Sequence, residues 1–368
     1  MDFTKSNTEG VRVADGNSIA DFLTRGGLAV SCTSTHIAPQ VVTYGMECED
    51  IFAFQPNKAK RLVQLLGVRN HVNVSFVEES PLGDFAIEMQ RNPRGSVLAG
   101  DVSGIGVTVG LGIDTNGEPV MLDIAQAPHV LIAGTTGAGK SVLLNSIISQ
   151  LVNQNTPEQC ELVLIDPKRV EFGAWAGIPH LRQPVVQGSE NAIAALKALC
   201  DEMDGRYDCI ACRGCKTAEE AHLSRIVCVI DELADLMLTS KKAVEDMIVR
   251  IAQLGRAAGI HLVVATQSPR ATVVTGLIKA NLPCKIALTC NGVRESMVIL
   301  DHKGAEQLLG AGDAIIRQAG AETRFQAALT PQEDVLELVQ EVKSKYKPIK
   351  RKQTKRNTGI LKWILTGE

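Results

Sequence analysis

The sequence lacks a long hydrophobic run, a signal peptide and a strong net charge. No stretch approaches the ~18 consecutive apolar residues of a membrane-spanning helix, so we expect no transmembrane segment. The formal net charge of −3 gives no global sign of a nucleic-acid partner, and any such surface must be local. Ten cysteines without a secretory signal indicate a reducing compartment, in which they stay thiols. We therefore expect a soluble, cytoplasmic protein.

The 368 residues are enough for about two domains. Residues 1–94 read as a small α+β domain, because short runs with strand character alternate with amphipathic helical runs. We predict helices at 18–24 and 58–66, and strands at 40–46, 72–77 and 84–89.

Strand-like and helical runs also alternate along residues 95–330. We predict strands at 129–133, 161–166, 226–230, 259–267 and 285–289, and helices at 141–152, 190–203 and 242–258. This alternation indicates an α/β fold, a parallel sheet covered by helices on both faces. Residues 331–368 add a predicted helix at 331–345 and a basic C-terminal tail.

A phosphate-binding loop lies at residues 134–141, which read GTTGAGKS. It follows an apolar run and precedes a helical run, which is the strand, loop and helix context that this motif requires. Its glycines let backbone N–H groups surround phosphate oxygens, Lys140 reaches the β- and γ-phosphates, and Ser141 holds Mg²⁺. The sequence therefore predicts binding and hydrolysis of a nucleoside triphosphate. The residues expected to contact the nucleotide are Gly134, Thr135, Thr136, Gly137, Ala138, Gly139, Lys140, Ser141 and Val142.

Two acidic residues, Asp231 and Glu232, follow the apolar run 225–230. Such a run is typical of a buried parallel strand. At its tip Asp231 can hold Mg²⁺ together with Ser141, and Glu232 can polarise the attacking water. Acidic residues after a strand often serve only solvation, but beside a phosphate loop we expect them to be catalytic.

Eight segments resemble, in order, the successive motifs of the FtsK/SpoIIIE family of DNA translocases. They are 128–142, 164–171, 177–181, 229–237, 256–261, 265–267, 275–281 and 304–310. The resemblance is strong over 95–330 and weaker over the N-terminal domain. It implies a RecA-like P-loop ATPase domain with a neighbouring α domain, a homo-hexameric ring, ATP and Mg²⁺ as ligands, and double-stranded DNA in the channel.

The resemblance also implies roles for single residues. Lys140 and Ser141 would bind triphosphate and metal, and Asp231 with Glu232 would form the Walker B pair. Gln267 is similar to the polar sensor that reads the γ-phosphate. Arg256 is the candidate arginine finger for the ATP of a neighbouring subunit, and Lys168 and Arg169 are further candidates for the same interface. For both arginines an ordinary surface ion pair is the alternative.

The segment 268–279 resembles the pore loop of the family, with Arg270 and Lys279 as the expected partners of DNA phosphates. The sequence departs here from the family pattern. Ser-Pro-Arg stands at 268–270 where TQRPS is typical, and Met297 stands where an arginine is usual. Whether Arg294 replaces the missing charge stays open.

The C-terminal tail is strongly basic between Lys343 and Arg356 and then carries Ile360, Leu361, Trp363, Ile364 and Leu365. Three roles are weighed: a solvated end, capture of DNA, and contact with a partner or a membrane surface. We expect no winged-helix module of the family after Leu329.

Cys209, Cys212 and Cys215 have the spacing of metal ligands, with Cys200 and His222 near them in the sequence. One interpretation is that these residues bind zinc or an iron–sulfur cluster. Free thiols are the favoured one, because no second pair of cysteines completes the site.

The main prediction is an ATP-driven double-stranded DNA translocase. Two alternatives stay open: a secretion-type ATPase that moves protein, and a DNA-binding nucleotide switch that does not translocate. Stimulation of ATP hydrolysis by duplex DNA separates them.

Overall fold

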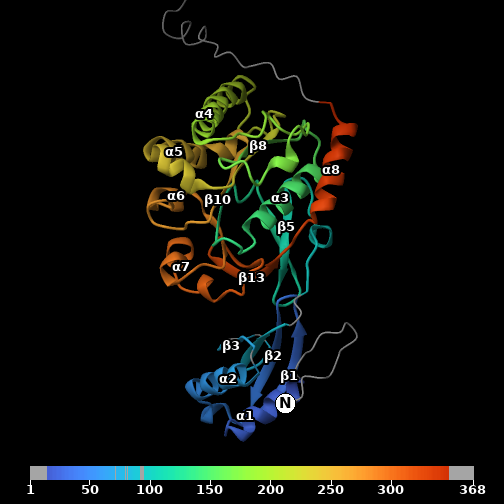
Figure 1. Ribbon diagram of the computed structural model, residues 1–368, viewed down its shortest axis with the longest axis vertical. Coiled ribbons are helices and arrows are strands. Elements are labelled where there is room, and N and C mark those ends of the chain that lie inside the picture. Colours follow the sequence, from blue (N-terminus) through green and yellow to red (C-terminus); the bar gives the residue numbers. More distant parts are fainter. Residues whose placement is uncertain (1–14, 71, 79, 81, 92–94, 348–368) are drawn as a thin grey trace, which may run out of the picture. The chain divides into compact units, whose positions relative to one another are not determined.

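The computed structural model describes residues 15–70, 72–78, 80, 82–91 and 95–347 (Figure 1). These residues form two compact units. The described residues up to Val102 group with two later segments, 111–120 and 323–329, and the remaining residues form the second unit. The domain boundaries expected at 94 and 330 stay predictions.

The first unit contains an antiparallel sheet in the order β1-β2-β4-β3. Its strands are β1 (Val30–Ile37), β2 (Val41–Cys48), β3 (Val74–Val77) and β4 (Phe85–Gln90). Helices α1 (Gly16–Arg25) and α2 (Pro56–Asn70) supply apolar residues to the core around Tyr44 and Phe85, and the short η1 (Ile51–Ala53) precedes α2. All the elements predicted here are present. The unpredicted β1 is an edge strand of mostly polar, half-exposed residues, so it lacks a hydrophobic signature.

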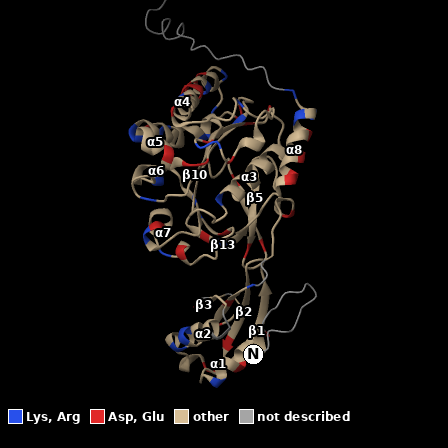
Figure 2. Ribbon diagram, viewed as in Figure 1, with Lys and Arg blue, Asp and Glu red and all other residues tan. Residues whose placement is uncertain are grey.

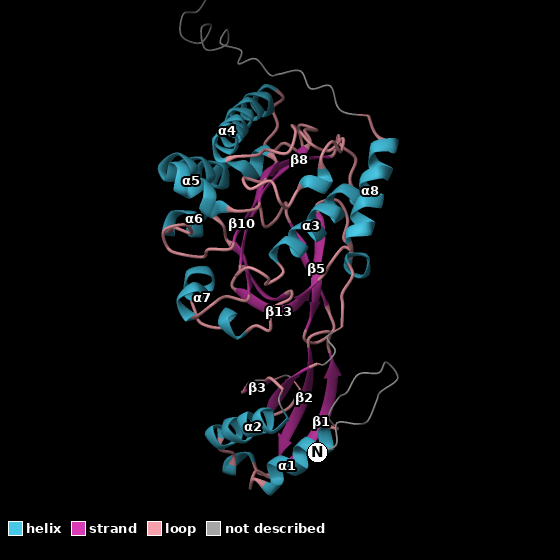
Figure 3. Ribbon diagram, in the orientation of Figure 1, coloured by secondary structure: helices cyan, strands magenta, loops and turns pink. Residues whose placement is uncertain are grey.

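A second sheet has nine strands within the described residues (Figure 3). Across the sheet they are β6 (Pro119–Asp123), β5 (Thr108–Asp114), β13 (Ala321–Ala327), β12 (Asp313–Gln318), β11 (Cys284–Leu288), β7 (His129–Ala133), β10 (Ile260–Thr266), β9 (Arg225–Ile230) and β8 (Cys160–Ile165). The five strands from β11 to β8 are parallel, whereas β12 pairs antiparallel with β11, and β13 antiparallel with β5.

The parallel strands are buried on both faces, since every residue of β7, β8 and β10 is buried although neighbouring side chains point to opposite faces. Helices α4 (Ser189–Cys212) and α5 (Leu233–Ala258) pack against one face in a shared core. In Figure 3, α6 (Gly276–Asn281) and α7 (Val293–Leu300) lie on the side of α4 and α5, while α3 (Lys140–Gln154) and α8 (Gln332–Lys345) lie together on the other. The remaining short helices are η2 (Ala99–Val102), η3 (Gly173–Trp175) and η4 (Ala305–Gln307).

The predicted α/β fold is confirmed, and each of the five predicted strands of this sheet has its counterpart. The antiparallel strands were not predicted. Helix α5 begins at Leu233, directly after the acidic pair and earlier than predicted, and bends at Ser240, whose φ of −154° is not helical. Among the helices of the described segments, none is both long and apolar enough to cross a membrane.

Candidate nucleotide site and adjoining surfaces

The loop between β7 and α3 depends on two glycines with left-handed backbone. Gly137 has a φ of 80° and Gly139 a φ of 107°, which side chains rarely adopt. A Cβ on Gly139 would also lie 2.7 Å from the backbone nitrogen of Gly312. That nitrogen donates to the carbonyl of Ala138 at 2.8 Å. Because Gly139 caps α3 without a side-chain hydrogen bond, the first N–H groups of the helix are left to receive an anion.

Lys140 and Asp231 meet at the carboxyl edge of the sheet, although 91 positions separate them. The Lys140 Nζ donates to the Asp231 carbonyl at 2.6 Å and to its carboxylate, and both residues are 3% exposed. Burial raises the pKa of the Asp231 carboxyl, Lys140 opposes this shift, and the charges of Glu171 and Asp166 add to it. A buried acidic group of this kind is stabilised by a cation.

Asp166 stands at the end of β8, beside Asp231 at the end of β9, since the two strands pair in register. It is 1% exposed, and its Oδ2 accepts from the backbone nitrogens of Glu171 and Phe172 at 2.9 and 3.1 Å. Its Oδ1 is buried and has no hydrogen-bond partner in the described residues. This orphaned oxygen and the Asp231 carboxylate fit Mg²⁺, which takes one or two carboxylates and otherwise water and phosphate.

The carboxylate of Glu232 is held by three donors. Glu232 is the N-cap of α5, and its Oε1 accepts from the backbone nitrogen of Ala234 at 3.1 Å. The same oxygen accepts from the Thr266 hydroxyl at 2.7 Å, and Oε2 accepts from the backbone nitrogen of Gln267 at 2.9 Å. The carboxylate is therefore fixed to the end of β10 as well as to its own helix.

Gln267 connects the phosphate loop with this carboxylate. Its Oε1 accepts from the Thr136 hydroxyl at 2.8 Å, while its backbone nitrogen donates to Glu232. This is a consequence of topology, because β10 lies between β7 and β9 and the carboxyl ends of all three strands meet. The structure thus brings Lys140, Asp231, Glu232 and Gln267 together, as their predicted roles require.

Two residues at this edge escaped the sequence reasoning, Thr266 and Asp166. Each is the polar residue that closes or follows a buried parallel strand next to Asp231 and Glu232. That position is the available signal, but many polar residues at strand ends serve only the following turn.

Arg256 lies in the last turn of α5 and is exposed. Its guanidinium makes no ion pair or hydrogen bond with other described residues, so the ion-pair alternative has no support there. Lys168 pairs with Asp235 at 3.3 Å, and Arg169 is exposed with a φ of 63°. The structure does not join Arg256 to the groups around Lys140.

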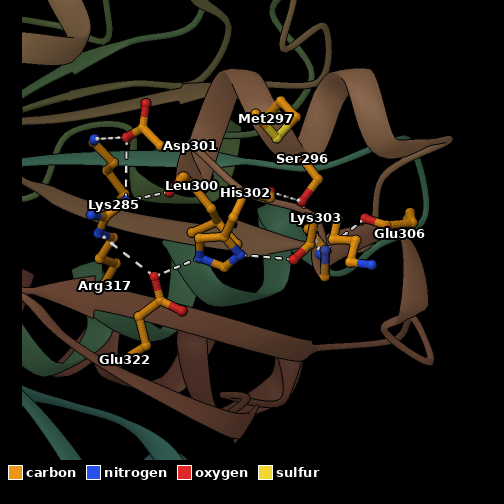
Figure 4. A network of polar contacts seen from close by, with 12 residues as sticks. Lys285, Ser296, Met297, Leu300, Asp301, His302, Lys303, Glu306, Arg317 and Glu322 are labelled. Carbon is orange, nitrogen blue, oxygen red and sulfur yellow. Dashed lines mark hydrogen bonds and ion pairs between the residues drawn. The ribbon is translucent and has the colours of Figure 1, made fainter.

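The two residues predicted to contact DNA differ in their surroundings. Arg270 is exposed in the segment between β10 and α6. Lys279, in α6, donates to the Met297 carbonyl at 3.0 Å and pairs with Asp301 at 2.6 Å. Asp301 also pairs with Lys285 and Arg317, both at 3.2 Å, and Figure 4 shows these two side chains around it. Lys279 is therefore already compensated, whereas the Arg270 side chain has no ion pair with any residue that the structure describes.

Figure 2 shows basic residues on α5, α6 and α7, mixed with acidic ones on α5 and α7, and Arg294 is exposed on α7. Met297, which stands where the family has an arginine, is 46% exposed. Of the tail, only Lys343, Lys345 and Lys347 are described, the first two in the last turn of α8, and residues 348–368 lie outside the described residues.

Cys209 and Cys212 belong to the end of α4, and Cys215 follows in the next turn. Across the part of the chain that the structure describes, no three His, Cys, Asp or Glu side chains converge as a metal site. None of these three cysteines forms a disulfide, and the choice between free thiols and a metal site stays a prediction.

The glycine loop, the lysine at the start of α3 and the acidic pair after β9 define the class of this protein: it is a P-loop ATPase.

Comparison with known proteins gives the family. The model of the FtsK/SpoIIIE family matches residues 101–224 and 215–271. The protein named DNA translocase FtsK in Streptomyces avermitilis is 41% identical over 295 residues, which cover 72% of this chain and 33% of that protein. The protein of the same name in Caldanaerobacter subterraneus is 45% identical over 249 residues, which cover 65% of this chain and 35% of that protein. The chain therefore belongs to the FtsK/SpoIIIE family, and it spans about a third of the length of these relatives.

Solved structures agree with the fold. The pCW3 conjugation coupling protein TcpA with ATPγS is similar with a TM-score of 0.63 and 23% identity, over 89% of this chain and 99% of that chain. The cytoplasmic domain of the type VII secretion ATPase EccC from Thermomonospora curvata is similar with a TM-score of 0.57 and 26% identity, over 64% of this chain and 31% of that chain. The first likeness, at its low identity, concerns the fold alone.

Proposed function

We propose that this chain is the motor of an ATP-driven double-stranded DNA translocase that works as a homo-hexameric ring. The observation that carries the proposal is the convergence of Lys140, Asp231, Glu232 and Gln267 at one edge of the parallel sheet. The names of the relatives at about 41% identity support DNA as the cargo.

In this proposal the loop 134–139 and the start of α3 hold the triphosphate of ATP. Lys140 moves its ammonium from Asp231 to the phosphates, and Asp231 is then left to hold Mg²⁺ with Ser141. When bound, Mg²⁺ supplies neutralisation of the charge that develops on the phosphate oxygens. Asp166 lies beside this site, and its Oδ1 has no hydrogen-bond partner in the described part of the chain.

Glu232 orients the water that attacks the γ-phosphate, since its carboxylate is already immobilised by donors from two elements. Gln267 senses the phosphate from the adjacent strand end and is tied to the loop through Thr136. Arg256 completes the site of a neighbouring copy as an arginine finger, which is supported by its exposed guanidinium, unpaired among the described residues.

DNA contact is assigned to the segment 268–279, with Arg270 and Lys279 as phosphate partners. Contacts of this kind carry no sequence information, which suits a motor that moves along any duplex. The basic tail adds to DNA capture in the same way; its rival role is contact with a partner or a membrane surface through the apolar residues around Trp363.

One alternative has an observation in its favour. The likeness to the secretion ATPase EccC, at 26% identity, is compatible with a motor that moves protein. A nucleotide switch that binds DNA without moving is the other alternative.

The experiment is steady-state ATP hydrolysis by the purified chain with and without linear duplex DNA of random sequence. We expect the duplex to raise kcat. Robust hydrolysis that the duplex leaves unchanged would favour protein transport or switching over DNA translocation.

A further inference from the structure

Thr266, the last residue of β10, occupies a central position in the hydrogen bonds of the site. Its side chain is fully buried, and its hydroxyl donates to Glu232 Oε1 at 2.7 Å. Its oxygen accepts from the backbone nitrogen of Ser268 at 3.1 Å. A hydroxyl has one proton, and both neighbours have a fixed sense, since a backbone N–H only donates and a carboxylate only accepts. The direction of this chain of hydrogen bonds is therefore fixed, from Ser268 through Thr266 to Glu232.

The two oxygens of Glu232 are not equivalent as a result. Oε1 accepts from Thr266 and from Ala234, which uses its two lone-pair directions. Oε2 accepts from Gln267 and, among the described residues, from no second donor. The oxygen with acceptor capacity to spare is thus Oε2, and the Thr266 hydroxyl is one of the two groups that decide this.

We propose that Thr266 is a positioning residue that presents Oε2 of Glu232 to the attacking water and ties that orientation to the segment beginning at Ser268. The inference rests on the proposed function, because it needs Glu232 to act on water. The connection between Glu232 and this segment runs on through the backbone, because the Arg270 N–H donates to the Ser268 carbonyl at 2.8 Å. A change at Arg270 on binding DNA reaches Glu232 through three hydrogen bonds.

A purely structural role for Thr266 is the competing explanation, since a β-branched residue suits a buried strand. Valine has the same shape and lacks only the hydroxyl, whereas serine keeps the hydroxyl and loses the methyl group. If the hydroxyl matters, Thr266→Ser resembles the unchanged protein and Thr266→Val does not; if packing matters, the order reverses.

The test compares Thr266→Val and Thr266→Ser in the full chain with saturating duplex DNA. For Thr266→Val we expect kcat to fall about 10- to 100-fold, the amount expected when one hydrogen bond to a charged group is lost from the transition state. Affinity for a fluorescent ATP analogue, measured by equilibrium titration, should stay unchanged, and Thr266→Ser should recover most of kcat. Thr43→Val is the matched control, because Thr43 is also buried in a strand but its hydroxyl has no partner among the described residues.

Two results would overturn the inference: a normal kcat in Thr266→Val, or equal losses of nucleotide affinity and melting temperature in both Thr266 variants. Failure of the proposed function itself is recognised separately, because the unchanged protein would then show no hydrolysis that duplex DNA stimulates.

Discussion

The nucleotide site and the segment proposed to contact DNA hold their charged groups in opposite ways. Lys140, Asp231 and Glu232 are each 3% exposed and are bonded to one another or to a neighbouring strand. Arg270 is exposed, whereas Lys279, whose side chain is 18% exposed, lies between the two cases because it pairs with the 53% exposed Asp301. A charge taken out of water needs defined partners, whereas an exposed charge keeps its hydration and tolerates many arrangements.

This contrast predicts how far each region can change in sequence. Replacing a buried group at the sheet edge leaves its partner uncompensated, so residue type and spacing are both constrained. A phosphate backbone can be met by cations at many positions on a surface, so the basic residues can shift along a loop. The comparison holds only if the buried groups dominate catalysis and the exposed ones affect DNA binding by modest steps.

The largest effect is expected for Lys140→Ala. Removing the ammonium deletes a phosphate contact and leaves the Asp231 carboxylate buried without its cation. Binding of a fluorescent ATP analogue should be lost, and hydrolysis should fall to background. Nearly normal nucleotide affinity in a variant that melts like the unchanged protein would contradict the claim that the buried charged groups dominate nucleotide binding and catalysis.

Arg256→Ala should follow with a loss of about 10³-fold or more in kcat while ATP still binds, because an arginine supplied in trans acts on the transition state. Arg256 is thus the exception to the comparison, an exposed residue that is expected to affect catalysis strongly. Mixing this variant with Lys140→Ala should restore some hydrolysis, since certain interfaces then pair an intact Lys140 with an intact Arg256. The absence of recovery in mixtures shown to co-assemble counts against the trans role.

Two buried histidines near the amino ends of β7 and β10, at the edge of the sheet opposite the nucleotide site, predict acid sensitivity. His129 begins β7 and accepts from the backbone nitrogen of Leu262 through Nδ1 at 3.2 Å. Burial lowers its pKa to about 4, and burial together with His129 lowers the pKa of His261 to about 3. In the unfolded chain the histidine pKa is near 6.5, so below that pH the unfolded chain binds more protons than the folded one. The stability that is present above pH 6.5 is therefore lost as the pH falls towards the lowered pKa values.

At pH 5 the loss is about 2 kcal/mol for His129, taken from its lowered pKa. Urea unfolding at pH 7 and pH 5 measures it. His129→Asn keeps an acceptor for Leu262 and should reduce the difference between the two pH values by about that amount. An equal difference in both proteins would show that His129 does not titrate as its burial implies.

The smallest effect concerns DNA. Arg270→Ala should weaken duplex binding and lower the slope of log affinity against log salt by about 1, as expected for one phosphate contact. Lys279→Ala should change the slope less, because Asp301 already compensates Lys279. Fluorescence anisotropy across a salt series gives both slopes, and a larger change for Lys279→Ala would reverse the assignment.

The sequence was most informative where chemistry constrains residue type and spacing together. The glycine loop, Lys140 and the Asp231–Glu232 pair could be assigned because each needs a specific backbone or charge at the tip of a strand. The strands β5, β6, β12 and β13 were missed although β5 with β6, and β12 with β13, are consecutive neighbours joined by short turns that contain Asn116–Gly117 and Ala319–Gly320, a local signal of hairpins. Their place in the large sheet could not be assigned, because the pairing of β13 with β5 joins segments far apart in the chain. Neither could the Asp301 network around Lys279, because three of its members come from separate elements and meet only in the fold.

Within the site itself, Thr266 shows the limit most plainly. A threonine at the end of a strand is an ordinary residue in the sequence, and only the 2.7 Å contact with Glu232 gives it a role. Arg256 is the reverse case: its role comes from the family resemblance, and its exposed position in the last turn of α5 brings it to no group of the site around Lys140.

The most direct test of the central claim is displacement of a triplex-forming strand from duplex DNA by the purified chain. Movement along the duplex should release the third strand only with ATP and Mg²⁺, at a rate that rises with ATP concentration. Glu232→Gln, which keeps the shape of the side chain and removes its charge, should bind ATP and release nothing. Release without ATP, or duplex-stimulated hydrolysis without any release, would contradict the claim that this chain translocates along DNA.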